Sequence, residues 1–149
     1  MRARSVHGFT LVELIVVMAI AGILAAVAMP RLAGRNGFDS RGYADQLAAT
    51  VRYAQKLAVA QRREVFVQVT VGQASLCYVA TAPCATPAPG PGGEKPYTVT
   101  APAGVSLGPA TTLGFDAAGR PDIATTLELL VNGVGTYRVR VERETGYVH

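Results

Sequence analysis

The sequence predicts an α+β protein in which an N-terminal transmembrane helix precedes an amphipathic helix packed on antiparallel β-sheets. Three observations carry this prediction: an apolar run near the start, a stretch with helical spacing of apolar residues after it, and many short alternating segments separated by turns. Beyond the apolar run, the 149-residue chain has room for one small domain.

The apolar run extends from Phe9 to Met29, where every residue except Thr10 and Glu13 is apolar or small. At about 1.5 Å of rise per residue it measures roughly 30 Å, the thickness of a hydrocarbon core, so a membrane helix is predicted at 9–29. Glu13 is an ionisable group in this run, which indicates a functional carboxylate with a cationic partner. The alternative is a glutamate near the helix end that reaches the headgroups.

The start of this run resembles the class III signal of type IV pilins and type II secretion pseudopilins. Two arginines and a histidine precede Gly8, and Phe-Thr-Leu-Val-Glu follows it. The resemblance implies that a prepilin peptidase cuts between Gly8 and Phe9 on the cytoplasmic side, and that Phe9 is then N-methylated. It also implies that Glu13 guides assembly. The new Phe9 ammonium of a neighbouring subunit would suit it as a partner, because each charge relieves the desolvation of the other.

The same resemblance implies the location and partners of the chain. Residues 1–8 form the leader, the 9–29 helix lies in the bacterial inner membrane with its N-terminus in the cytoplasm, and the 43–149 domain is periplasmic. The expected partners are the prepilin peptidase and other pseudopilins or pilins in a filament.

An ordinary secretory signal is the competing interpretation, because Ala26-Val-Ala28 resembles an A-x-A cleavage site after a basic segment. The apolar run is longer than a typical signal h-region, and such a region has no use for Glu13. Cleavage there would leave a chain that starts at Met29.

A flexible neck is predicted at 30–42. Pro30 lacks a backbone N–H and is expected to kink or end the helix. Gly34, Gly37 and Gly42 then follow among arginines, a composition that forms poor helix.

Helical periodicity returns at Tyr43 and predicts an amphipathic helix of about 20 residues. Apolar residues fall on one face at spacings of three and four: Tyr43, Leu47, Val51, Ala54 and Ala58. This face is expected to pack on a sheet.

Strand patterns follow directly. Residues 64–71 alternate strictly, and 74–81 return after a Gly-Gln turn, so a hairpin is predicted. Residues 83–96 are so rich in proline and glycine that an exposed loop is predicted. Further short strands are predicted at 97–100, 105–107, 112–116, 127–131, 136–142 and 147–148.

The order of these elements resembles the GspH/FimT branch of the family. The segments that carry this resemblance are Gln-Leu-Ala and Arg-Tyr-Ala-Gln-Lys-Leu-Ala before the valine-rich strand, Gly-Phe-Asp-Ala-Ala-Gly119, and the closing Thr-Gly-Tyr-Val.

The two cysteines, Cys77 and Cys84, have neither a C-x-x-C nor a zinc-ligand spacing. In an oxidising periplasm a disulfide is expected that ties a strand end to the following loop. Two free buried thiols are the alternative.

The inventory of reactive groups predicts that the chain is not an enzyme and holds no cofactor or metal. The only histidines are His7, in the leader, and His149, so no internal histidine can serve a nucleophile. Loss of Arg2 and Arg4 with the leader leaves 12 basic and 10 acidic residues, a net charge of +2, which weakens any argument for nucleic acid from the whole-chain pI.

DNA binding is the remaining specific hypothesis, with Arg138 and Arg140 as its candidate contacts on one strand face. Some FimT-like minor pilins bind DNA through a Gly-Arg-x-Arg pattern near the C-terminus. This sequence departs from that pattern, since Asp122 replaces the second arginine after Gly119 and Arg138 lacks the preceding glycine. A solvated strand face is therefore the favoured interpretation of these arginines.

The sequence thus predicts a non-catalytic minor pseudopilin of the type II secretion system that assembles into a periplasmic pseudopilus for protein secretion. The alternative is a FimT-like minor pilin of a type IV pilus, acting in pilus biogenesis or in DNA binding during natural transformation.

Overall fold

A computed structural model of the chain describes residues 10–33 and 36–149, with side chains described for 10–27 and 39–149. The chain divides into two compact units, residues 1–35 and 36–149. The predicted leader, with Gly8, and the predicted methylation site Phe9 lie outside the described residues.

The N-terminal unit contains helix α1, Leu11–Ala33. The large apolar side chains of its described part are solvent-exposed, including Leu11, Ile15 and Ile23. Within the residues that the structure describes, no helix has both the length and the apolarity needed to cross a membrane.

The predicted neck at 30–42 is wrong in its secondary structure. Helix α1 continues through Pro30 to Ala33, and helix α2, Asn36–Gln61, begins before the expected start at Tyr43. An interior proline removes one hydrogen bond and crowds the carbonyl four residues earlier, which can bend a helix without ending it. The glycines of 36–42 cost only about 1 kcal/mol each, which packing can offset. Ser40 is fully buried, so the added turns of α2 belong to the packed domain.

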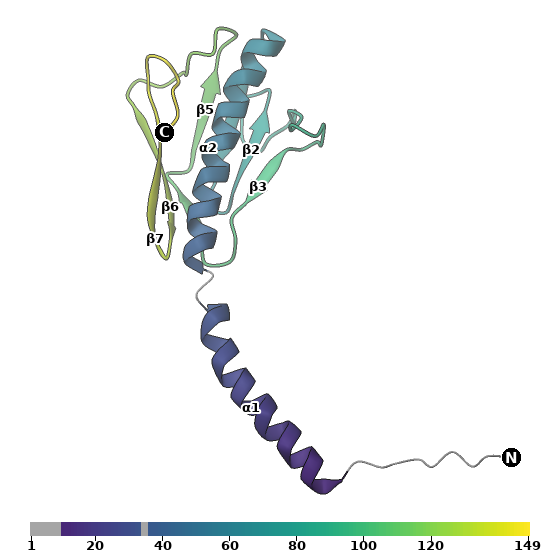
Figure 1. Cartoon of the computed structure of the whole chain (residues 1–149). Helices are drawn as coiled ribbons and strands as arrows, with labels where there is room; N and C mark the ends of the chain where they lie inside the picture. Colours follow the sequence, from purple (N-terminus) through teal and green to yellow (C-terminus); the bar gives the residue numbers. More distant parts are fainter. Residues whose placement is uncertain (1–9, 34–35) are drawn as a thin grey trace, which may run out of the picture. The chain divides into compact units, whose positions relative to one another are not determined.

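The C-terminal unit combines α2 with two antiparallel sheets. A four-stranded sheet has the order β3-β2-β1-β5, and a three-stranded sheet has the order β4-β6-β7. The strands are β1 Val65–Val69, β2 Gln73–Cys77, β3 Thr98–Thr100, β4 Ser106–Gly108, β5 Thr111–Phe115, β6 Leu127–Gly133 and β7 Gly135–Val141. Figure 1 shows α2 running along both sheets, with β6 and β7 on one side of it and β2 and β3 on the other. The predicted α+β fold is confirmed, and the predicted last strand is a single bridge between Val141 and Val148.

The predicted apolar face of α2 forms the centre of the core. All five predicted residues are buried, and Leu47, Val51, Ala54 and Ala58 have no exposed surface. They pack with the inward side chains of both sheets in one cluster. The hydroxyl of Tyr43 donates a hydrogen bond of 3.0 Å to the Val99 carbonyl, and burial raises the pKa of Tyr43 to about 12.

The first hairpin is shorter than predicted. Strand β1 places Val65, Val67 and Val69 in the core, but β2 ends at Cys77 rather than at residue 81. Gln68, on the opposite face of β1, explains the difference: its buried amide donates to the carbonyls of Val79 (3.2 Å) and Thr81 (2.8 Å). The chain folds back over this face because a buried amide needs hydrogen-bond partners.

The proline-rich loop at 83–96 is only partly exposed, contrary to the prediction. Ala88 is fully buried, and its N–H donates to the Leu76 carbonyl at 2.9 Å. Pro87 also forms a bridge with Cys77. Strand β3 pairs with β2 only as far as Ser75, so these loop residues cover the rest of that edge and satisfy its backbone groups.

Candidate functional site

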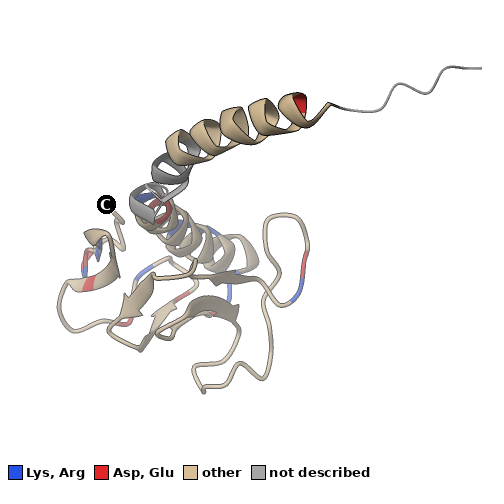
Figure 2. Ribbon diagram, turned by 90° about the horizontal axis from the view of Figure 1, so that it is seen from below, with Lys and Arg blue, Asp and Glu red and all other residues tan. Residues whose placement is uncertain are grey.

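The described part of the N-terminal motif forms the cap of α1. The Thr10 hydroxyl accepts a hydrogen bond of 3.3 Å from the Glu13 N–H, and the Thr10 carbonyl accepts one of 3.2 Å from the Leu14 N–H. Thr-x-x-Glu is the sequence of a capping box, and a carboxylate in the first turn favours the helix dipole. In Figure 2, the red that marks Asp and Glu occurs along the described part of α1 only at this first turn. The motif therefore presents one solvent-exposed carboxylate at the start of an exposed apolar helix.

The structure joins Cys77 and Cys84 in a disulfide, as predicted. Cys77 is the last residue of β2 and is fully buried. The bond therefore fixes the return of the chain after the hairpin, beside the segment that Gln68 holds.

Reduction of this disulfide is expected to lower the free energy of unfolding by about 2.5 kcal/mol, because cross-linking a short loop restricts the unfolded chain. Urea unfolding of the 36–149 domain, with and without reductant, measures the difference. The free energy of unfolding of the double variant Cys77→Ala with Cys84→Ala should not change with reductant. A stability of the wild-type domain that is indifferent to reductant contradicts the structural role of the bond.

The two candidate DNA contacts lie on β7 and differ in their surroundings. Arg140 is the cross-strand partner of Glu128 on β6. Its Nε and Nη2 donate hydrogen bonds to the Glu128 carboxylate, at 3.1 and 2.5 Å respectively. Arg138 is exposed and forms no ion pair among the described residues. The charge of Arg140 is thus offset by Glu128. Arg138 and Arg140 therefore do not form a free cationic patch together.

The ion pair with Arg140 is expected to change how Glu128 titrates. The hydrogen bond and charge of Arg140 hold the pKa of Glu128 below its usual range. A carboxylate with a lowered folded pKa stabilises the fold above its unfolded pKa, and this contribution is lost as the pH falls through the folded pKa. In Arg140→Ala, the NMR titration midpoint of Glu128 should rise toward the ordinary glutamate value, whereas Arg138→Ala should shift it less. An unchanged midpoint in Arg140→Ala contradicts the pair.

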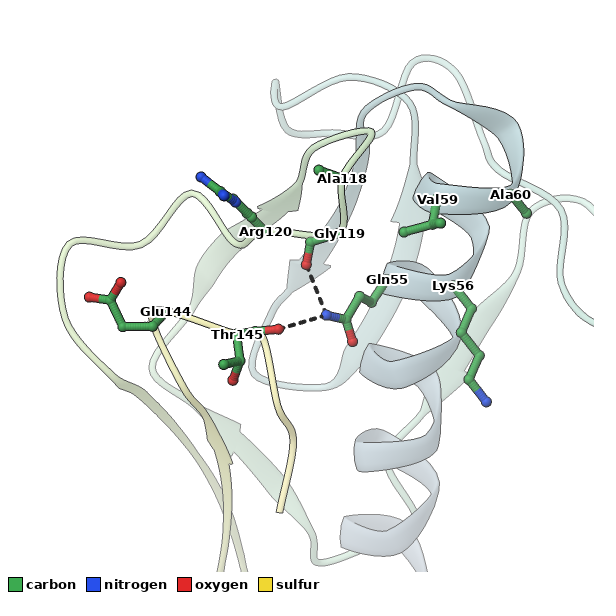
Figure 3. Close-up of a pocket in the computed structure, with 9 residues that line it drawn as sticks. All are labelled: Gln55, Lys56, Val59, Ala60, Ala118, Gly119, Arg120, Glu144 and Thr145. Atoms are coloured by element: carbon green, nitrogen blue, oxygen red, sulfur yellow. Dashed lines mark hydrogen bonds between the residues drawn. The ribbon is translucent and has the colours of Figure 1, made fainter.

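A groove of about 500 Å³ lies between the C-terminal half of α2 and two loops. Figure 3 shows its lining residues, which come from α2, from the loop after β5 and from the loop after β7. The Gln55 amide lies between the loops and donates to the carbonyls of Gly119 (2.8 Å) and Thr145 (3.0 Å). One side chain of α2 therefore ties both loops to the helix.

Sequence reasoning did not identify this groove, although its loops include segments that carry the GspH/FimT resemblance. The sequence signal that could have indicated the groove is the pair of glycines Gly119 and Gly146, which adopt φ angles of +80° and +67°. A Cβ at Gly146 would lie 2.6 Å from the Gln55 Nε2 and 3.1 Å from the Gly119 carbonyl oxygen. Only glycine permits this close approach.

The described residues contain no cluster of three or more histidine, cysteine, aspartate or glutamate side chains that could hold a metal ion. Of the carboxylates near the C-terminus, Glu128 pairs with Arg140 and Glu142 with His149. Glu142 accepts from the His149 Nε2 at 3.1 Å, and this contact lowers the pKa of Glu142. The first pair is a cross-strand contact between β6 and β7, and the second lies beyond the end of β7.

Known proteins resemble this chain both in its N-terminal sequence and in its fold. Residues 3–29 match the prokaryotic N-terminal methylation motif. The fold is similar to that of the type IV minor pilin FimU of Pseudomonas aeruginosa, with a TM-score of 0.60 and 19% identity over 73% of this chain and 85% of FimU. It is also similar to the minor pseudopilin EpsH of the type 2 secretion system of Vibrio cholerae, with a TM-score of 0.56 and 17% identity over 74% of this chain and 94% of EpsH.

The chain thus combines a prokaryotic N-terminal methylation motif with a domain that has a pilin-like fold. The fold is shared with these minor pilin and minor pseudopilin structures, which agrees with the resemblance to the GspH/FimT branch. A curated relative, the type IV narrow pilus major component PilA5 of Thermus thermophilus, is 40% identical over 65 residues, which are 44% of this chain. The match spans about half the length of PilA5, 53%.

Proposed function

We propose that the chain is a non-catalytic subunit of a pilin-like filament. The prepilin peptidase cleaves between Gly8 and Phe9, Phe9 is N-methylated, and the 9–29 segment anchors the subunit in the inner membrane with its domain in the periplasm. The observation that carries the proposal is the methylation motif at 3–29, which includes most of a helix with exposed apolar side chains and precedes a packed domain.

In this proposal Glu13 is the assembly residue. Its carboxylate is exposed at the first turn of α1, and its N–H is held by Thr10. In a filament it pairs with the Phe9 ammonium of the neighbouring subunit, so that two charges in an apolar bundle neutralise each other.

We propose the type II secretion pseudopilus as the machine, and EpsH supports it as a secretion pseudopilin of the same fold. The ion pair of Arg140 with Glu128 also removes one cation from the candidate DNA-binding face. The type IV pilus is the second candidate, favoured by the likeness to FimU and by the local identity to PilA5.

In-cell crosslinking of the tagged full-length chain, followed by mass spectrometry of the captured proteins, tests the proposal. Capture of a major pseudopilin with the secretion platform is expected. Capture of a major pilin instead assigns the chain to a type IV pilus, and capture of neither contradicts a filament role.

A further inference from the structure

The groove between α2 and the two loops has an apolar centre. It is lined there by Val59, Ala60 and Ala118, and Val59 has 47% of its surface exposed. An exposed valine beside two alanines offers a small hydrophobic contact surface that the chain itself does not cover.

The rims of the groove carry uncompensated positive charge. Figure 3 shows the Lys56 ammonium and the Arg120 guanidinium pointing away from each other, on opposite sides of the groove. Among the described residues, neither forms an ion pair. Glu144 also lines the groove, but its carboxylate lies 3.3 Å from the Arg143 Nε and is therefore already paired.

The walls of the groove are held by hydrogen bonds of their own. The Asp116 carboxylate accepts from the N–H groups of Ala118 and Arg120, each at 2.8 Å. The second loop is closed by the Gly146 N–H, which donates to the Glu142 carbonyl at 2.8 Å. With Gln55 joining both loops to α2, the groove is preformed, so little ordering is required of it on binding.

The groove lies far from the point where the N-terminal segment enters the domain. Helix α2 begins at Asn36, and Gln55 follows about 30 Å further along its axis at 1.5 Å per residue. The groove is therefore well separated, along α2, from the start of the domain.

We propose that this groove docks a segment of a neighbouring subunit in which an apolar side chain is flanked by carboxylates. The apolar side chain packs between Val59 and Ala118, and the carboxylates meet Lys56 and Arg120 at the rims. This arrangement of apolar centre and charged rim is typical of protein interfaces. The inference rests on the proposed filament function and adds the surface and the chemistry of one contact.

A photo-crosslinking residue at Ala60 in the full-length chain, in cells, tests the docking. We expect it to capture a filament subunit, with the crosslinked peptide containing an apolar residue next to aspartate or glutamate. Lys56→Glu with Arg120→Glu should reduce this crosslink about tenfold, because like charges facing each other across an interface are strongly unfavourable. Lys95→Glu with Arg138→Glu, which changes the net charge equally at exposed sites outside the groove, should leave it unchanged.

Two further measurements separate the possible failures. A photo-crosslinker at Val16 in α1 reports assembly through the N-terminal segment, so loss of crosslinks at both Val16 and Ala60 contradicts the filament function itself. Crosslinks at Val16 without any at Ala60, or an Ala60 crosslink that survives both charge reversals, contradict the docking proposal. Lys56→Gln with Arg120→Gln repeats the test without new negative charge, and should weaken the crosslink in the same direction.

Discussion

Glu13→Gln is expected to reduce incorporation of the subunit into filaments by about tenfold or more, while its level in the membrane stays the same. The substitution leaves the Phe9 ammonium of the neighbouring subunit without a counter-charge, and breaking a buried ion pair costs about 3–5 kcal/mol. The fraction of the chain in sheared filaments, compared with the membrane-bound fraction by immunoblot, measures the effect.

The choice of glutamine separates charge from helix capping. Glutamine replaces glutamate in capping boxes, so Glu13→Gln keeps the Thr10 hydrogen bond and loses only the charge. Thr10→Ala is the matched control, since it removes the helix cap, at a cost of about 1 kcal/mol in helix stability, and keeps the carboxylate. Near-normal assembly of Glu13→Gln, or an equal defect in both variants, contradicts an electrostatic role for Glu13.

Phe115→Ala should destabilise the domain more than any surface change. Phe115 is the largest fully buried side chain that the structure describes, with 1% of its surface exposed, and it lies at the end of β5 opposite Val65 on β1. Truncation of a buried phenylalanine costs about 3–5 kcal/mol, a large part of the roughly 5–15 kcal/mol by which a typical domain is stable. Urea unfolding of the 36–149 domain, followed by circular dichroism, measures the loss.

Val71→Ala is the control for this truncation. Val71 follows β1 and is 64% exposed, so the change is expected to stay within about 0.5 kcal/mol. A loss for Phe115→Ala no larger than for Val71→Ala contradicts the position of Phe115 in the core.

Periodicity was sufficient to predict most of the fold. The 3.6-residue spacing from Tyr43 to Ala58 identified the helix face that the structure buries, and the alternating valines of 65–69 identified the first strand. Both patterns reflect a single physical requirement, the burial of one face, which the sequence records directly. The turn glycines correctly separated the later strands.

The wrong predictions fall where local propensity was overruled by packing or hydrogen bonding. The glycines of 36–42 indicated poor helix, yet the turn that contains Ser40 is packed in the domain. Ala88 is in a segment of extreme loop composition, yet it covers an edge of β2. In each case the deciding contact joins residues distant in sequence, which no local pattern contains.

The candidate sites divide in the same way. Cys77 and Cys84 could be paired from the sequence because they are only two in number and near each other. The pairing of Arg140 with Glu128 depends on the register of β6 and β7, and the groove joins three segments through Gln55. Sequence reasoning therefore identified Arg140 but could not tell that its charge is offset.

The intact mass of the mature protein, purified from the membrane fraction, tests the central claim most directly. The proposed filament function requires a chain that begins at Phe9 and carries one additional methyl group at its N-terminus. A mature chain that begins at Met29, as cleavage by an ordinary signal peptidase would produce, contradicts it, because such a protein has lost both Phe9 and Glu13.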